Sequence, residues 1–390
     1  MPDHRASPAS RHPLLATDAA SGPVLLLSAV LALIWANSRF AAGYTELWHT
    51  SIQWAGAQGG ESLRFWINEG LMSVFFLLVG LELRWELQYG ALAKPAIAML
   101  PAIAAGGGVI APALIYLLLN PQLPARSGWG VAVATDIAFA VGVLTLLGAR
   151  VSRECRVLLL AIAIADDLIA ILIIAAFYSG NLGATGLLIA AAGVGSSLLL
   201  QRLAPRSFTG QAIAGAIIWF GLYRAHIHPS IAGAVLGLLL PPASGIEEFD
   251  SALKPWVAFL VLPLFAIANA GIAIAPLRGA DAAALHVTFA VAVALAIGKP
   301  LGIGLAVLGT IRLGLASLPP RVHTREVILI GITAGIGFTL AIFIANVAFD
   351  EPHLLEAAKL GALLASSLAA AAALIYGRFS GRGSAGQSSS

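Results

Sequence analysis

The chain has 390 residues, of which 59% are hydrophobic and only 11% are charged. Soluble domains carry about 25% charged residues, and a mean hydropathy of +0.90 leaves too few polar groups to cover a surface in water. This composition argues against an intrinsically disordered chain, a nucleic-acid-binding domain and a soluble enzyme. The net charge of +3, from 22 Lys and Arg against 19 Asp and Glu, is too small to indicate a partner. The sequence predicts an integral membrane protein.

Long apolar runs without alternation favour membrane-spanning helices over the strands of a β-barrel. A spanning helix needs about 20 largely apolar residues, and the chain offers twelve candidates. They are residues 23–38, 67–87, 95–119, 128–148, 155–178, 183–201, 208–225, 228–240, 255–277, 285–310, 326–349 and 357–376. We expect an N-terminal cytoplasmic tail over residues 1–22, an uncleaved first span, one transmembrane domain over 23–376 and a disordered Gly/Ser-rich tail over 377–390.

The distribution of Lys and Arg predicts the orientation, because cytoplasmic loops are enriched in these residues. With twelve spans and both termini in the cytoplasm, fifteen of the 22 cations fall on the cytoplasmic side and six on the other. The remaining one, Lys299, falls inside the tenth helix. The single cysteine, Cys155, excludes an internal disulfide, and no metal-ligand spacing occurs.

Four ionisable residues fall inside the predicted spans: Asp136, Asp166, Asp167 and Lys299. An ionised side chain at mid-bilayer costs about 2.5–3.5 kcal/mol on insertion scales. One interpretation is a misplaced helix boundary that puts the residue at the lipid headgroups. The other is a pathway for ions or protons.

The adjacent pair Asp166 and Asp167 falls at the midpoint of the fifth helix. Neighbours on a helix point about 100° apart, so both carboxylates can line one cavity. Two like charges in a low dielectric cannot both ionise cheaply, and either a proton or a small hard cation such as Na⁺ or Li⁺ relieves the repulsion. Competition between the two is the minimal device for exchanging Na⁺ for H⁺, and the hydroxyl of Thr135 offers a further oxygen ligand.

Lys299 supplies the opposite charge, since a buried ammonium needs a partner. An ion pair with one of the two aspartates that breaks when a cation enters would couple cation binding to proton movement. The alternative is a permanent ion pair that only locks two helices together.

The fourth and eleventh predicted helices are rich in glycine at their centres. Gly331, Gly335 and Gly337 lie within seven residues, and glycine costs about 1 kcal/mol in a helix interior. Interrupted spans at corresponding places in two halves mark the midplane site of inverted-repeat transporters. There Asp136 would offset the positive ends of half-helices and Lys299 the negative ones. The alternative is close helix packing, which we expect for Gly106–Gly108 in the third helix.

Seven stretches, in order from the second helix to the eleventh, carry a family resemblance. They are Phe75-Phe-Leu-Leu-Val-Gly-Leu-Glu82-Leu-Arg84, Ala134-Thr-Asp136-Ile-Ala-Phe-Ala, Ala165-Asp166-Asp167-Leu168, His228-Pro-Ser-Ile-Ala-Gly233, Leu262-Pro-Leu-Phe-Ala-Ile-Ala-Asn269-Ala-Gly271, Gly298-Lys299-Pro300-Leu-Gly302 and Gly335-Ile-Gly-Phe-Thr339. Together they resemble the NhaA family of sodium/proton antiporters.

The resemblance implies an all-α polytopic fold with twelve transmembrane helices. Helices 3–5 and 10–12 would form inverted-topology repeats, and helices 4 and 11 would be broken and cross. It implies electrogenic antiport by alternating access, with more H⁺ entering than Na⁺ or Li⁺ leaving, for pH and sodium homeostasis in a bacterial inner membrane. Lipids and a homodimer, formed through a β-hairpin in the loop 38–65, are the expected partners; no cofactor is expected.

The resemblance also implies roles for single residues. Asp166 and Asp167 match the cation- and proton-binding carboxylates, with Asp166 the partner of Lys299, and Thr135 and Asp136 match the broken helix. The sequence departs from the family where Trp85 follows Arg84 and where the loop before the ninth helix reads Asp250-Ser-Ala-Leu-Lys254. Glu82, Glu86, Asp250 and Lys254 then form either a cytoplasmic pH-responsive cluster or ordinary solvated charges; His228 is interpreted as structural.

Three other classes fit less well. A symporter for an organic anion needs polar groups for its substrate, whereas the centre here is acidic. A channel gives no reason for an exchangeable Lys–Asp pair. An intramembrane protease needs catalytic aspartates on separate helices in settings absent here, and no Gly-x-Ser-x-Gly motif offers a serine nucleophile.

Overall fold

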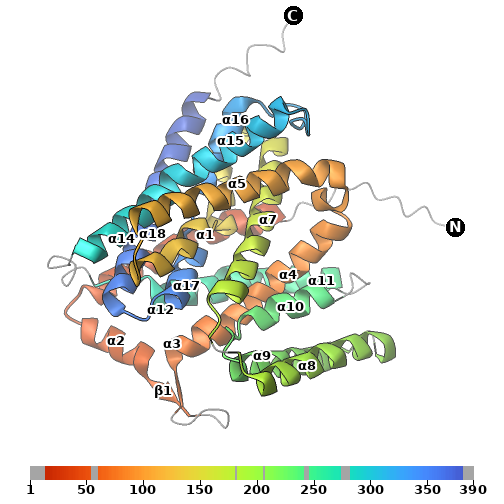
Figure 1. Cartoon of the computed structure of the whole chain (residues 1–390), viewed down its shortest axis with the longest axis vertical. Coiled ribbons are helices and arrows are strands. Elements are labelled where there is room, and N and C mark those ends of the chain that lie inside the picture. The colour runs from red at the N-terminus through yellow and green to blue at the C-terminus, as the bar shows by residue number, and fades with distance from the viewer. Residues whose placement is uncertain are drawn as a thin grey trace, which may run out of the picture.

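A computed structural model describes the backbone at residues 14–53, 60–180, 182–204, 207–240, 246–273 and 282–380 (Figure 1). At residues 14–20, 246–250 and 380 it describes the backbone alone. The N-terminal tail up to residue 13, the tip of the loop at 54–59 and the C-terminal residues 381–390 lie outside this range.

Helices make up nearly all of the described structure. The α-helices are α1 (Leu14–Ala36), α2 (Ala41–His49), α3 (Leu63–Phe65), α4 (Met72–Gln88), α5 (Pro95–Leu119), α6 (Ile137–Leu146), α7 (Arg153–Phe177), α8 (Ala184–Leu203), α9 (Phe208–Arg224), α10 (Ile231–Leu239), α11 (Ile246–Trp256), α12 (Leu262–Asn269), α14 (Ala282–Val293), α15 (Lys299–Arg312), α16 (Thr324–Ala334), α17 (Phe338–Ala348) and α18 (Pro352–Ser380). The 3₁₀-helices are η3 (Ala91–Ala93), η4 (Ala125–Val133) and η5 (Gly148–Arg150), and the π-helices are η2 (Trp66–Leu71), η6 (Val257–Val261) and η7 (Ala294–Gly298).

A helical segment occurs at each of the twelve predicted ranges. Within the described residues seven helices are long and apolar enough to cross a membrane, and ten qualify if each of three bent pairs is one span. The two predicted spans that are not among these ten are α9 and α10, which are shorter, with 17 and 9 residues. A nearly all-helical fold with several membrane-spanning helices is thus confirmed, whereas the count of twelve and the crossing of the fourth and eleventh helices stay predictions.

Two helix ends differ from the prediction. Helix α1 begins at Leu14 rather than at residue 23, because Pro23 is accommodated inside the helix instead of starting it. Helix α18 continues to Ser380, beyond the expected end at residue 376.

The long loop after the first span is partly regular. It contains α2, which turns away from α1 by 112°, and an antiparallel hairpin of β1 (Ser51–Ile52) and β2 (Glu61–Ser62). The expected hairpin is present. We call the end of the molecule that carries it, at the bottom of Figure 1, the hairpin side.

The predicted interruptions of the fourth and eleventh spans are present. Residues 134–136 separate η4 from α6 with a bend of 47°, and residues 335–337 separate α16 from α17 with a bend of 45°. We call these two segments the helix breaks.

Glycines bring helices into close contact where the sequence predicts packing. A Cβ on Gly107 of α5 would lie 2.4 Å from the carbonyl oxygen of Gly302 of α15, and one on Gly302 would lie 2.1 Å from that of Gly107. A Cβ on Gly108 would lie 2.9 Å from Ile303, whereas Gly106 faces open space. Helix α15, which begins at Lys299, is therefore held directly against α5.

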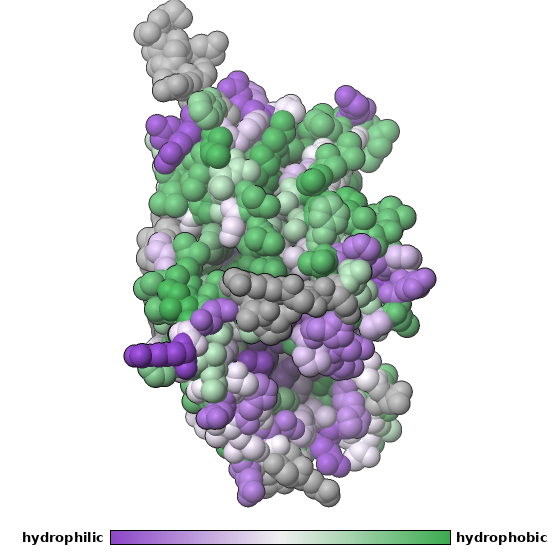
Figure 2. Space-filling view, turned by 90° about the vertical axis from the view of Figure 1, so that its left-hand side faces the viewer, coloured by the Kyte–Doolittle hydropathy of each residue, from purple (hydrophilic) through white to green (hydrophobic). Residues whose placement is uncertain are grey.

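Apolar side chains cover much of the outer surface. Leu118 of α5, Leu188 of α8 and Leu203 of α8 are 80%, 72% and 73% exposed, as expected for side chains that face lipid. Figure 2 shows a broad hydrophobic area over the upper part of one face, and hydrophilic residues gathered around a hollow at the lower end. That end is the hairpin side, so the polar surface there marks where the molecule meets water.

Candidate functional site

Helix α7 carries the aspartate pair, Asp166 and Asp167, near its middle. The helix begins where the Ser152 hydroxyl accepts a hydrogen bond from the backbone N–H of Cys155, at 3.1 Å, which satisfies one of the free donors of the first turn. Asp166 and Asp167 are 2% and 4% exposed. Both lie near the middle of a 25-residue helix, away from its ends, which argues against the interpretation as misplaced interfacial charges.

Lys299 lies directly after the π-helix η7, as the first residue of α15. Its side chain is completely buried, and its Nζ lies 2.6 Å from Oδ2 of Asp166. The same ammonium donates to the hydroxyl of Thr135 in the first helix break, and that hydroxyl donates to the carbonyl oxygen of Ala334, at 3.1 Å. Lys299 therefore joins α7, α15 and both interrupted spans.

Asp136 ends the first helix break and satisfies the N-termini of two half-helices. Its Oδ1 accepts from the N–H of Phe139 in α6, at 3.0 Å, so that Asp136 is the N-cap of α6. Its Oδ2 accepts from the N–H of Thr339 at 3.0 Å and from the Thr339 hydroxyl at 2.5 Å, at the start of α17. A carboxylate at the positive ends of two helices is in the environment that favours it, as the sequence analysis expects.

The two helix breaks also contact each other through their backbones. The N–H of Asp136 donates to the carbonyl oxygen of Ile336, at 2.7 Å, and a Cβ on Gly337 would lie 2.8 Å from the carbonyl oxygen of Ala134. Glycine at position 337 thus permits the close approach of the two breaks. Lys299 does not satisfy carbonyl groups there; among the described residues it bonds Asp166 and the Thr135 hydroxyl.

One oxygen on each member of the aspartate pair is left without a partner. Oδ1 of Asp166 and Oδ1 of Asp167 are buried and accept no hydrogen bond from the part of the chain that the structure describes. Buried polar atoms are normally satisfied, and carboxylate and hydroxyl oxygens are the ligands that hard cations prefer. With the Thr135 hydroxyl beside Lys299, these oxygens fit a small cation as a transported substrate.

The candidate pH-responsive cluster is brought together only in part. Lys254 Nζ lies 3.3 Å from Oε1 of Glu82, which joins α11 to α4. Glu86, which is 8% exposed, instead accepts from the N–H of Ala91 at 2.6 Å and stabilises the turn after α4. The side chain of Asp250 lies outside the described residues.

Polar contacts on the hairpin side were not anticipated from the sequence. Glu69 of η2 binds the ring of His228, with Oε1 and Nδ1 3.0 Å apart, and accepts from the N–H of Ser230, at 3.0 Å. These contacts support the structural interpretation of His228. The side chain of Asn269 is hydrogen-bonded to those of Asn68 and Asn346, and we call these three residues the asparagine triad.

The comparisons with known proteins agree over nearly the whole chain. A sequence model of the family described as Na⁺/H⁺ antiporter 1 matches residues 12–376. The Na⁺/H⁺ antiporter NhaA of Acidovorax sp. (strain JS42) is 52% identical over 374 residues, which cover 92% of this chain and 89% of the relative. The Na⁺/H⁺ antiporter NhaA of Janthinobacterium sp. (strain Marseille) is 45% identical over 415 residues, covering 93% and 91%.

A solved structure shares the fold at low sequence identity. The sodium/proton antiporter MjNhaP1 of Methanocaldococcus jannaschii matches with a TM-score of 0.55 and 15% identity, covering 94% of this chain and 98% of that one. At this identity the likeness concerns the fold alone. The family match and the identity to the two NhaA proteins, by contrast, extend over nearly the whole sequence, and the chain belongs to the NhaA-type family of Na⁺/H⁺ antiporters.

Proposed function

We propose that this protein is an electrogenic antiporter that extrudes Na⁺ or Li⁺ in exchange for a larger number of H⁺. In this proposal Asp166 and Asp167 bind the cation and the protons in competition, and alternating access exposes them to the two sides of the membrane. The observation that carries the proposal is the pair of buried, unpartnered carboxylate oxygens on adjacent residues beside Lys299.

The charges of the site support competition rather than joint binding. Lys299 offsets the charge of one carboxylate, Asp166, whereas Asp167 has no cationic partner among the described residues. A proton on Asp167, or a cation between the two carboxylates, removes the remaining repulsion. When Na⁺ binds Asp166 in place of Lys299, the ammonium loses its partner. The ammonium then releases its proton, or it re-forms the ion pair with Asp166 once Na⁺ leaves.

Thr135 and Asp136 contribute differently in this mechanism. The Thr135 hydroxyl already accepts from Lys299, so it is placed to offer its oxygen to a cation when the ammonium withdraws. Asp136 holds the two helix breaks together, and its negative charge contributes to the potential that attracts a cation. We propose that the breaks are where the two interrupted spans cross and move during transport.

The experiment is a transport assay in everted membrane vesicles. With an acid interior and a dye that reports the pH gradient, Na⁺ or Li⁺ added outside collapses the gradient, whereas K⁺ does not. Valinomycin with K⁺ on both sides removes the membrane potential, and this accelerates exchange if the cycle moves net charge. A pH series in the same vesicles measures the pH dependence of exchange.

Matched variants assign the activity to the aspartate pair. Asp166→Asn and Asp167→Asn are expected to abolish exchange while the protein still inserts in normal amount. Asp350→Asn, which makes the same chemical change at an exposed residue on the hairpin side, is expected to leave exchange intact. If no cation collapses the gradient at any pH with inserted wild-type protein, antiport is wrong and a symporter for an organic solute becomes the next hypothesis.

The cellular setting is also part of the proposal. We infer a bacterial inner-membrane protein with both termini in the cytoplasm, which acts in pH and sodium homeostasis and forms a homodimer through the hairpin of β1 and β2. Glu82 and Lys254 would set part of the pH response. Cross-linking in the native membrane tests the dimer, and a reporter fused to each terminus tests the orientation.

A further inference from the structure

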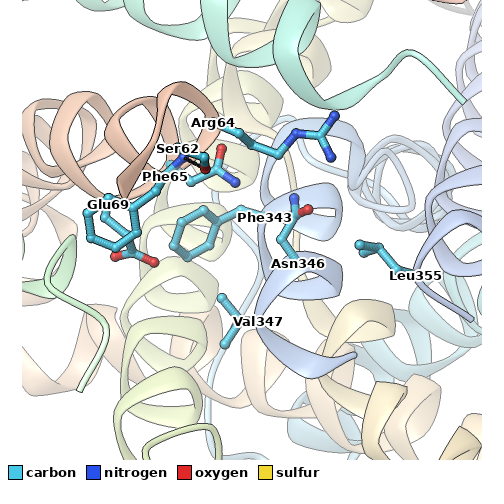
Figure 3. Close-up of a pocket in the computed structure, with 9 residues that line it drawn as sticks. Ser62, Arg64, Phe65, Glu69, Phe343, Asn346, Val347 and Leu355 are labelled. Carbon is cyan, nitrogen blue, oxygen red and sulfur yellow. Dashed lines mark hydrogen bonds between the residues drawn. The ribbon is translucent and has the colours of Figure 1, made fainter. Parts of the chain in front are cut away.

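A pocket of about 260 Å³ opens on the hairpin side between η2, α17 and α18. Its lining includes one anionic and one cationic side chain, Glu69 and Arg64, and the polar side chains Ser62, Asn68 and Asn346. Figure 3 shows Phe343 and Asn346 on α17 facing Phe65 and Glu69 across this space. The pocket has room for several water molecules and offers hydroxyl and amide oxygens to them.

Helix α17 runs from the ion site to this pocket along one face. Thr339, in its first turn, binds Asp136, while Phe343 and Asn346, four and seven residues further on, line the pocket. Residues at this spacing lie on the same side of a helix, and seven residues rise about 10 Å. The lining residue nearest the helix breaks, Phe343, is therefore about one helical turn from Thr339, and Asn346 is about two turns from it.

Along α17, two layers of side chains lie between the outer part of the pocket and the ion site, and both contribute to the pocket wall. The outer layer is the asparagine triad. Asn269 of α12 donates to Asn68 of η2 at 2.7 Å, and Asn346 of α17 donates to Asn269 at 3.1 Å. The layer sits where three separate helices meet, so it breaks if α17 moves away from α12.

The inner layer is aromatic. The ring of Phe343 is fully buried and packs against Phe76 of α4 and Phe265 of α12, with ring centroids 5.2 and 6.3 Å apart. An apolar layer of this kind excludes a hydrated cation, because no group in it replaces the water of hydration. The aspartate pair beyond it is at most 4% exposed.

The geometry points to the pocket as the hairpin-side vestibule for the hydrated cation, with the asparagine triad and Phe343 as the gate between this vestibule and the ion site. The inference rests on the proposed antiport and adds to it the route on one side and the residues that close it. The gate opens when α17, which is joined to the ion site through Thr339 and Asp136, shifts relative to α12. The asparagines and Phe343 are positioning residues in this scheme, since they control access and do not bind the ion in the site.

A disulfide across the gate tests this inference. In a Cys155→Ser background, the pair Asn269→Cys and Asn346→Cys replaces two side chains that are hydrogen-bonded to each other across α12 and α17. Oxidation is expected to lower Na⁺-dependent exchange at least tenfold, and a reducing agent is expected to restore it. The matched control is Ser197→Cys with Gln211→Cys, which replaces a side-chain pair 2.7 Å apart between α8 and α9 and should leave exchange within twofold when oxidised.

A second measurement does not depend on disulfide formation. Val347 lines the pocket outside the gate, so Val347→Cys labelled from the hairpin side with a bulky, membrane-impermeant maleimide should lose exchange at least tenfold. Gln122→Cys is the control, because Gln122 is exposed in the loop before η4, which the charge distribution places on the same side. Its labelling should leave exchange unchanged.

The outcomes separate the gate from the antiport itself. If the inserted wild-type protein does not exchange Na⁺ for H⁺, the proposed function fails. If the parent is active, undiminished exchange by the fully cross-linked Asn269–Asn346 pair, or by the fully labelled Val347→Cys protein, overturns the gate and the vestibule.

Discussion

Three buried aspartates lie in two neighbouring regions, the helix breaks and the middle of α7, and they differ in how their oxygens are satisfied. At the breaks, both oxygens of Asp136 accept hydrogen bonds, one from α6 and two from α17. In α7, one oxygen of Asp166 and one of Asp167 accept none within the described structure. All three are at most 4% exposed. Burial alone therefore does not distinguish a carboxylate that holds helices together from one that is available to a cargo ion.

Lys299 connects the two regions, and its removal should have the largest effect on stability. Lys299→Ala leaves Asp166 buried without its cation, and breaking one side of a buried ion pair costs about 3–5 kcal/mol. We expect a large fall in the thermal unfolding temperature of the purified protein in detergent. Lys94→Ala, at an exposed lysine before α5, is the control and should leave this temperature nearly unchanged.

The double variant Lys299→Ala with Asp166→Asn sharpens the measurement. Because it removes both charges, it should recover much of the stability that Lys299→Ala alone loses. An unfolding temperature for Lys299→Ala equal to that of the wild type would mean that the pair contributes nothing to the fold, and that the link between α7 and the breaks is incidental.

The variant Gly337→Ala tests whether the fold and the exchange activity require contact between the two helix breaks. An alanine Cβ there would meet the carbonyl oxygen of Ala134 at 2.8 Å, so Gly337→Ala must push the two breaks apart, at a cost of about 1–3 kcal/mol. The thermal unfolding temperature and the exchange rate are both expected to fall. Gly304→Ala in α15 is the matched control, because a Cβ there meets nothing within 4 Å and alanine favours the helix. Equal behaviour of the two variants would contradict the close contact.

Asp136 should behave as a helix cap when its side chain is changed. Asp136→Ala removes the acceptor for both half-helices, and the loss of one N-cap costs about 0.5–2 kcal/mol. Asp136→Asn keeps one acceptor oxygen and should lose less stability. Both carboxylate oxygens of Asp136 already accept hydrogen bonds from the protein. The variant Asp136→Asn is therefore expected to retain measurable Na⁺-dependent exchange under conditions in which Asp167→Asn retains none. Complete loss of exchange by a stable Asp136→Asn protein would place Asp136 among the residues that the ion cycle requires.

The sequence predicts the parts of this arrangement that depend on local composition. Long apolar runs mark the helices, clustered glycines mark the breaks, and an aspartate inside an apolar run marks the buried charges. The asparagine triad could not be predicted in this way, because its members are 201 and 77 residues apart and a single amide in an apolar helix gives no periodic signal. The three π-helices are likewise absent from the prediction, since their backbone hydrogen bonds depend on the packing of neighbouring helices.

The helix boundaries likewise could not be predicted from local composition alone. Helix α1 extends into a segment that its polar residues assign to a tail, and the loop at 38–65 contains the additional helix α2. Glu69 and His228 are 159 residues apart, and only the tertiary fold brings them together. The sequence contains the charges of the site, but the hydrogen bonds that distinguish Asp136 from Asp167 come from segments distant along the chain.

The smallest expected effect concerns Glu82 of α4, which lies outside both regions. Glu82→Gln removes one negative charge and its contact with Lys254, 3.3 Å away. The negative potential that attracts protons toward the aspartate pair then falls, so the pH at half-maximal exchange should shift downward, by about a few tenths of a unit for a partly screened charge. The control is Glu46→Gln, at an exposed glutamate of α2 on the hairpin side. An unshifted pH profile for Glu82→Gln would make the ion pair with Lys254 a structural contact between α4 and α11, and the pH response would then have to arise in the aspartate pair itself.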